Sequence, residues 1–217
     1  MSDPAVTSRQ LPRGRHGLPR ETVIASQRDR ILSAMAHAMT ENGYVGTSVA
    51  TIIKRAGVSR ETFYEQFRSK EDCFEAAYER AAQLLLERIV EATGTLRDVP
   101  VTREQRIEAM LGAYLSGLAA DPADARLFLI EVYAVGPAAI ARRGELQESF
   151  TAMVADILDA HTAEQYFACQ TLVAAVSAMV TARVAADDLD GLQALHGPLL
   201  ELLRRSGDLF GSPETSR

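Results

Sequence analysis

The chain has 217 residues, 47% of them hydrophobic and 24% charged, so it can bury a sizeable core in one or two domains. Tryptophan is absent, alanine and leucine are abundant, and runs of β-branched residues are scarce, which favours helices over strands. No apolar run approaches the roughly 20 residues that span a bilayer, and no apolar segment follows the N-terminal arginines. We therefore expect a cytoplasmic protein with no membrane span and no signal peptide.

The net charge of −6 is distributed unevenly along the chain. Residues 1–70 contain 11 Lys and Arg against 6 Asp and Glu, a balance of +5, whereas residues 71–217 contain 12 against 23, a balance of −11. A basic first third joined to an acidic remainder indicates that one small part of the protein meets phosphate. The negative total charge therefore does not exclude DNA as a partner.

The cysteines, Cys73 and Cys169, are far apart in sequence and lack the spacing of metal ligands. This pattern predicts two free thiols in a reducing compartment and leaves a redox switch as the alternative. We expect no metal and no other cofactor.

The N-terminal part is predicted to contain an arm and one helix. Residues 1–19 combine Pro, Gly and Arg, which predicts a flexible basic arm. The arm is either a solvated tail or a segment that reaches the minor groove or phosphate through Arg13, Arg15, His16 and Arg20. A helix is expected over residues 21–41, where apolar residues recur with helical spacing, and Asn42-Gly43 should end it.

Residues 47–70 predict two short helices separated by a tight turn. Thr47 is expected to cap a helix over residues 48–56, and Ser59 a second helix over residues 60–67, with Gly57 in the turn between them. Ser69 stands three residues before Asp72, a capping-box spacing that opens a long helix reaching Thr93-Gly94. This is the layout of a helix-turn-helix, whose second helix enters the major groove of DNA.

The rest of the chain is predicted to be helical as well. After a linker at residues 95–100, helices are expected over 102–120, 122–135, 138–160, 163–186 and 189–209, with a bend at Gly144 and an interruption at Gly197-Pro198. The sequence thus predicts an all-α protein. Residues 20–68 would form a three-helix DNA-binding domain, and residues 69–217 a bundle of roughly six helices.

Short polar side chains gather at the predicted starts of the two short helices, where backbone N–H groups can bind phosphate. Arg60 is best suited to reach a base, because its guanidinium can grip O6 and N7 of guanine together. Phe63 and Phe67 are four residues apart and should share the buried face. The predicted DNA-binding residues are Thr47, Ser48, Ser59, Arg60, Thr62, Tyr64, Gln66 and Lys70.

These residues resemble the TetR family of bacterial transcriptional regulators. The matching pattern covers roughly residues 25–75 and consists of Gly43-Tyr44, Thr47-Ser48-Val49, Ile52, Ala56-Gly57-Val58-Ser59, Thr62-Phe63-Tyr64, Phe67 and Ser69-Lys70-Glu71-Asp72. The resemblance implies that residues 69–217 form a ligand-binding and dimerisation domain. It also implies a homodimer that binds a double-stranded operator and an inducer that lowers its DNA affinity. The chain departs from the family pattern at Ile53 and Gln66, so the operator sequence does not follow by analogy.

Two further sets of residues are candidates for ligand binding and dimerisation. Bulky or flexible side chains in aliphatic helices can line an apolar cavity; these are Met110, Tyr114, Phe128, Tyr133, Met153, Phe167 and Met179. Arg126, Glu131, His161 and Arg183 are candidate polar anchors. The last two helices carry apolar faces that could pair with a second copy, and the predicted interface residues are Leu172, Val176, Met179, Leu195, Leu199 and Leu202.

The sequence therefore predicts a repressor released from a palindromic operator by a small, mainly hydrophobic inducer. It shows no phosphate-binding glycine loop, zinc helix or nucleophile elbow, so we expect no catalytic residues and no enzyme. Two alternatives stay open. The protein could be a ligand-independent dimeric DNA-binding protein, or an activator controlled by a protein partner.

Overall fold

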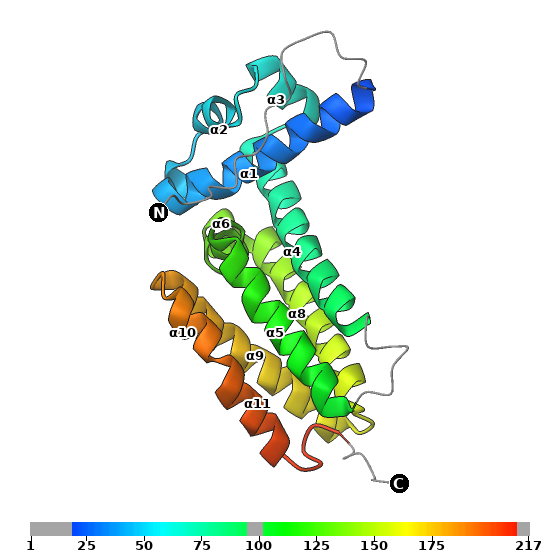
Figure 1. Cartoon of the computed structure of the whole chain (residues 1–217). Coiled ribbons are helices and arrows are strands. Elements are labelled where there is room, and N and C mark those ends of the chain that lie inside the picture. Colours follow the sequence, from blue (N-terminus) through cyan, green and yellow to red (C-terminus); the bar gives the residue numbers. More distant parts are fainter. Residues whose placement is uncertain (1–18, 95–101, 212–217) are drawn as a thin grey trace, which may run out of the picture.

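The computed structural model describes residues 19–94 and 102–211, and every regular element within them is helical, which confirms the all-α prediction. Helices α1 (Arg20–Gly46), α2 (Val49–Ala56) and α3 (Arg60–Gln66) form a unit at one end of the molecule. Helix α4 (Lys70–Gly94) leads from this unit into the bundle (Figure 1). The predicted arm up to residue 18 and the linker at 95–100 lie outside the described residues.

The bundle continues with α5 (Arg103–Ala120), α6 (Pro122–Arg126), α7 (Val132–Val135), α8 (Pro137–Leu158), α9 (Ala163–Ala185), α10 (Leu189–Ala194) and α11 (His196–Arg205). Helix α4 packs along α5, and α8 along α9. Thr102 and Thr162 start α5 and α9 with capping boxes, each closed by a glutamine three residues on, which satisfies N–H groups that have no partner within the helix.

Three details differ from the sequence-based prediction. The segment 122–135 is not one α-helix, because the π-helix η1 (Leu127–Glu131) separates α6 from α7. Helix α8 runs through Gly144 without a break. The last segment is interrupted at Leu195, and Gly197-Pro198 lies inside the first turn of α11, where proline is tolerated because its missing N–H would have no helical partner.

Helix α9 corrects the expectation that no segment is apolar enough to span a membrane. Its 23 residues meet that criterion by length and composition alone. One such helix is weak evidence for a membrane protein, since core helices of soluble proteins meet the same criterion. In this fold α9 packs against α8 and contributes Cys169, Val180 and Val184 to the core.

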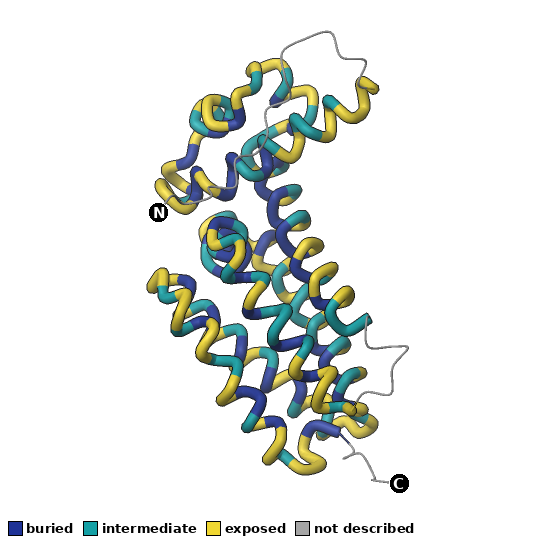
Figure 2. The backbone as a smooth tube through the Cα atoms, in the orientation of Figure 1, coloured by how far each residue is buried: buried dark blue, intermediate teal, exposed yellow. Residues whose placement is uncertain are grey.

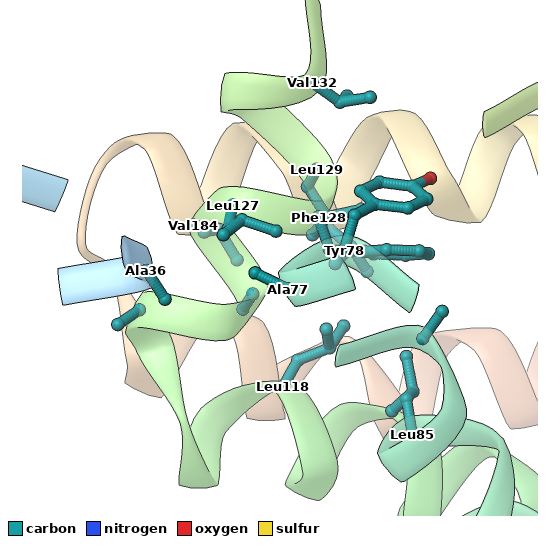
Figure 3. Packing of buried hydrophobic residues seen from close by; sticks show 14 of the residues in the cluster. Ala36, Ala77, Tyr78, Leu85, Leu118, Leu127, Phe128, Leu129, Val132 and Val184 are labelled. Atoms are coloured by element: carbon teal, nitrogen blue, oxygen red, sulfur yellow. The ribbon is translucent and has the colours of Figure 1, made fainter. Parts of the chain in front are cut away.

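One buried core joins the N-terminal unit to the bundle. Helix α1 packs against α4, α6 and η1, and Figure 3 shows Ala36 of α1 near Ala77 of α4 and Leu127 of η1. Buried residues recur along α4 from Cys73 to Ile89, and α9, α10 and α11 present many exposed residues (Figure 2). The N-terminal unit is therefore attached to the bundle by packed side chains, not by a linker.

Candidate nucleic-acid interface and ligand cavity

The turn between α2 and α3 depends on Gly57. This residue has φ 62° and ψ 41° and ends α2 by donating its N–H to the carbonyl of Ile53. Left-handed backbone is disfavoured for residues with a Cβ atom, so glycine suits this position. The turn places α3 on the outer side of the unit, away from the bundle (Figure 1).

The N-termini of both short helices are capped by exposed serines. The hydroxyl of Ser48 accepts the N–H of Thr51 at 3.1 Å, and that of Ser59 accepts the N–H of Thr62 at 3.0 Å. The prediction that Thr47 caps α2 was wrong. Thr47 is only 1% exposed and its hydroxyl donates to the carbonyl of Gly43, so its side chain is withdrawn from the surface that would meet DNA.

Helix α3 is fixed from beneath by two buried rings. Phe63 and Phe67 lie with ring centroids 5.6 Å apart in the core of the unit, as their spacing predicted. Tyr64 packs edge-to-face on Phe63 and is partly exposed, and the guanidinium of Arg60 lies 5.3 Å from the Tyr64 ring centroid. Arg60 and Tyr64 therefore project together from a rigid base.

The other predicted DNA-contacting residues bind groups within the protein or are partly buried. The ammonium of Lys70 donates to the carbonyl of Tyr44 at 3.0 Å and lies 4.0 Å from the Tyr44 ring centroid. Gln66 is half-buried, and its side-chain carbonyl is buried without a hydrogen-bond partner. The hydroxyl groups of Thr62 and Ser59 form a hydrogen bond with each other. The structure thus brings Ser48, Ser59, Arg60 and Tyr64 to the exposed surface and holds Lys70 and Gln66 closer to the core.

A polar junction links η1 to the end of α1. Gly43 has φ 67° and ψ 171° and turns the chain out of the helix. The next N–H, of Tyr44, donates at 2.9 Å to the carboxylate of Glu131, which is buried and lies 3.6 Å from Arg126. The Tyr44 hydroxyl donates to Glu71 at 2.9 Å, and burial raises the pKa of this phenol. Glu131, a suggested ligand anchor, instead connects the bundle to the helix-turn-helix.

The bundle contains a cavity of about 80 Å³ that is partly open to solvent. Aliphatic and aromatic side chains from α4, α5, η1, α8, α9 and α11 line it. Four of the predicted pocket residues lie in its wall, namely Met110, Tyr114, Phe128 and Met153. Tyr133, Phe167 and Met179 are largely on the surface instead.

The predicted polar anchors are placed elsewhere. Arg126 lies beside Glu131, Arg183 beside Asp188 and His161 beside Asp159, and none lines the cavity. The polar residues that do line it are Tyr114, Arg143, Gln147 and Ser177. Arg143, Gln147 and Ser177 were missed because charged and small polar residues on a helix are usually solvated, and helical periodicity gives no sign that this part of α8 borders a cavity.

The predicted dimer face is partly wrong. Leu172, Val176 and Leu199 are buried and line the cavity, so they serve the protomer's own core. Leu195 is half-buried against that core. Met179 and Leu202 are exposed, as a pairing surface requires. Tyr166 and Phe167, which were not among the predicted interface residues, are also exposed on α9.

Both cysteines are free thiols, as predicted. Cys73 is fully buried on α4, and burial raises its pKa to about 12. Cys169 is buried on α9, where its thiol donates to the carbonyl of Phe210. A buried, protonated thiol is a poor nucleophile, so the structure does not favour the redox alternative.

Residues 31–77, from α1 to the first turns of α4, match the family model described as bacterial regulatory proteins of the tetR family. Over 141 residues the chain is 28% identical to the HTH-type transcriptional activator FasR of Mycolicibacterium smegmatis. That alignment covers 65% of this chain and 61% of FasR, so the match spans about three fifths of the relative's length.

Two solved structures share this fold. The transcriptional regulator FadR from Bacillus subtilis, in complex with stearoyl-CoA, has a TM-score of 0.70 and 22% identity, covering 82% of this chain and 98% of FadR. A bacterial regulatory protein in the tetR family from Rhodococcus RHA1 has a TM-score of 0.67 and 18% identity, covering 87% of this chain and 98% of that protein. At such identities the likeness is one of fold.

Proposed function

Because this chain belongs to the TetR family of bacterial transcriptional regulators, we propose that it binds a palindromic operator as a cytoplasmic homodimer and that a small apolar ligand changes its DNA affinity. The observation that carries the DNA-binding part is the joint projection of Arg60 and Tyr64 from the rigid helix α3. Residues 20–68 would hold the DNA contacts and residues 69–217 the ligand and the second subunit, with α4 as the first helix of the second part. The proposal includes no catalytic step.

The operator proposal is tested by mobility shift on the DNA upstream of the protein's own gene and on selected random sequences. The wild type is expected to bind selectively, with an affinity that falls as salt rises. Arg60→Ala should weaken specific binding by about 10- to 100-fold, because a bidentate base contact is worth about 1–3 kcal/mol. Arg106→Ala, an exposed arginine on α5, is the matched control. Equal loss in both variants would argue against a role of α3 in recognition.

Dimerisation is supported by the exposed face of α9. Phe167 is 68% exposed and Met179 is 38% exposed, although both are large and apolar, and exposed alanines between them would let a second helix approach closely. Large apolar side chains exposed together on one helix are typical of an interface. Two helix-turn-helix units must lie about 34–36 Å apart to reach successive major grooves, which a dimer achieves and a monomer does not.

Met179→Glu is therefore expected to convert the dimer to a monomer, because a carboxylate would be buried against its symmetry mate. Sedimentation velocity at several protein concentrations measures this directly. Ser149→Glu on the exposed side of α8 should leave the dimer unchanged. A folded Met179→Glu variant that remains dimeric would place the interface on another surface.

Ligand control is supported by continuity between the cavity and the DNA-binding unit. Phe128 of η1 lines the cavity and stacks on Tyr78 of α4 at 5.2 Å between ring centroids (Figure 3). Three residues further along η1, the Glu131 carboxylate accepts a hydrogen bond from the Tyr44 N–H. A ligand that favours one arrangement of η1 and α4 would shift the spacing of the two recognition helices, provided that its affinity differs between the two states.

Repression and activation differ in where the operator lies relative to the promoter. We propose repression as the first function, with ligand releasing the operator. Activation is the second candidate, because FasR, with 28% identity over 141 residues, is an activator. In vitro transcription from the bound promoter separates them: added protein should lower transcript yield for a repressor and raise it for an activator.

A further inference from the structure

Among the residues that the structure describes, one charged side chain lines the cavity. Most lining residues are apolar, and Tyr114, Gln147 and Ser177 are polar but neutral, so Arg143 is the sole ionised group among them. Its Nε donates to the hydroxyl of Tyr133 at 2.8 Å, and its Nη2 donates to Ser177 Oγ at 3.0 Å. Two hydroxyl groups thus orient the guanidinium without neutralising it.

The adjacent residue, Arg142, differs from Arg143 in its ionic partners. Arg142 is exposed and forms ion pairs with Glu145 at 2.8 Å and Glu79 at 3.3 Å. Within the described ranges, 19–94 and 102–211, no carboxylate forms an ion pair with Arg143, although it is half-buried. An arginine in such a position usually has an anionic partner, because withdrawing a charge from water is costly unless it is paired.

The phenols near Arg143 cannot supply that partner at neutral pH. Burial raises the pKa of both Tyr78 and Tyr114 to about 12, against the opposing effect of the Arg143 charge. Both therefore stay protonated. The Tyr78 hydroxyl is moreover buried beside Arg143, which can donate to its oxygen but cannot accept its proton, so the phenol is a second donor at this place that lacks an acceptor.

We propose that Arg143 binds the carboxylate of an aliphatic acid whose hydrocarbon chain occupies the apolar part of the cavity. The guanidinium matches a carboxylate in shape and can hold it with charge-assisted hydrogen bonds. The chain would lie among residues such as Ile89, Leu111, Phe128, Leu158 and Leu203. This inference rests on the proposed function, since it names the ligand class of the proposed effector cavity.

The test compares three ligands with the same ten-carbon chain by isothermal titration calorimetry on the full-length protein: decanoate, 1-decanol and decanoyl-CoA. Wild type is expected to bind decanoate at least about tenfold more tightly than decanol, as hydrogen bonds to charged groups are worth about 1.5–3 kcal/mol. Arg143→Gln should abolish this preference while decanol still binds. Arg142→Gln, which removes the same charge one residue away, should retain it.

Three other outcomes would each contradict a different part of the proposal. Equal binding of decanoate and decanol by wild type would overturn the role of Arg143 and leave the apolar effector cavity standing. Tighter binding of decanoyl-CoA that is unchanged in Arg143→Gln would overturn the carboxylate assignment in favour of a thioester. If no ligand binds to protein that still shifts its operator, then the ligand-responsive part of the proposed function fails, and this inference with it.

Discussion

Replacing Phe63 with alanine is expected to unfold the helix-turn-helix and to abolish operator binding. Phe63 is fully buried and contacts the rings of both Phe67 and Tyr64. Removing a buried phenylalanine ring typically costs about 3–5 kcal/mol, because transfer free energy is lost and a cavity remains. Helix α3 has only seven residues, too few to be stable alone in water, so its conformation depends on packing against the core.

Hydrogen exchange is the most direct measurement of this effect. Amides of residues 49–67 should exchange faster in Phe63→Ala, while amides in α8 and α9 keep their protection. Phe63→Leu retains most of the apolar volume and should have a smaller effect, and Glu65→Ala, an exposed neighbour, should have almost none. Normal protection of α3 in Phe63→Ala would show that the unit does not depend on this ring.

Replacing Glu131 with alanine is expected to make operator affinity independent of ligand binding in the bundle. The Tyr44 N–H would lose its acceptor, at a cost of about 1–3 kcal/mol for a buried unsatisfied group. Arg126 would also lose the carboxylate that lies 3.6 Å away, and leaving a partly buried charge unpaired adds to the destabilisation. Operator affinity should then change little when ligand is added.

The exchange rate of the Tyr44 amide reports on this contact specifically. It should rise in Glu131→Ala and stay lower in Glu131→Gln, whose amide oxygen can still accept the hydrogen bond. Glu148→Ala, an exposed carboxylate on α8, is the control for loss of charge. Were Glu131→Ala to keep both a protected Tyr44 amide and the full ligand response, coupling would have to run through α4 alone.

The predicted dimer residues differ from the apolar residues that α9 exposes, and the difference has a geometric cause. Helix α9 is apolar or small on both faces, so periodicity alone does not decide which face turns inward. Packing against α8 buries Leu172, Val176 and Val180 and leaves Phe167 and Met179 exposed. The same packing places the predicted interface residues Leu172 and Val176 in the cavity wall.

The sequence by itself determined features that arise from contacts over a few residues. The capping serines, the Gly57 turn and the Phe63–Phe67 pair each depend on groups at most four positions apart, so their spacing was sufficient to predict the helix-turn-helix and the all-α fold. Thr47 is the exception. By spacing alone either Thr47 or Ser48 could cap α2, but packing at the end of α1 buries the Thr47 hydroxyl against the carbonyl of Gly43.

Only the tertiary structure decided the features that join distant parts of the chain. The bond between Tyr44 and Glu131 spans 87 positions, and the one between Arg143 and Ser177 spans 34. Neither pair has a local signal, because a single Glu or Arg on a helix is usually solvated. Their roles follow from burial, because water does not compete for these groups and each hydrogen bond is stronger at low dielectric constant.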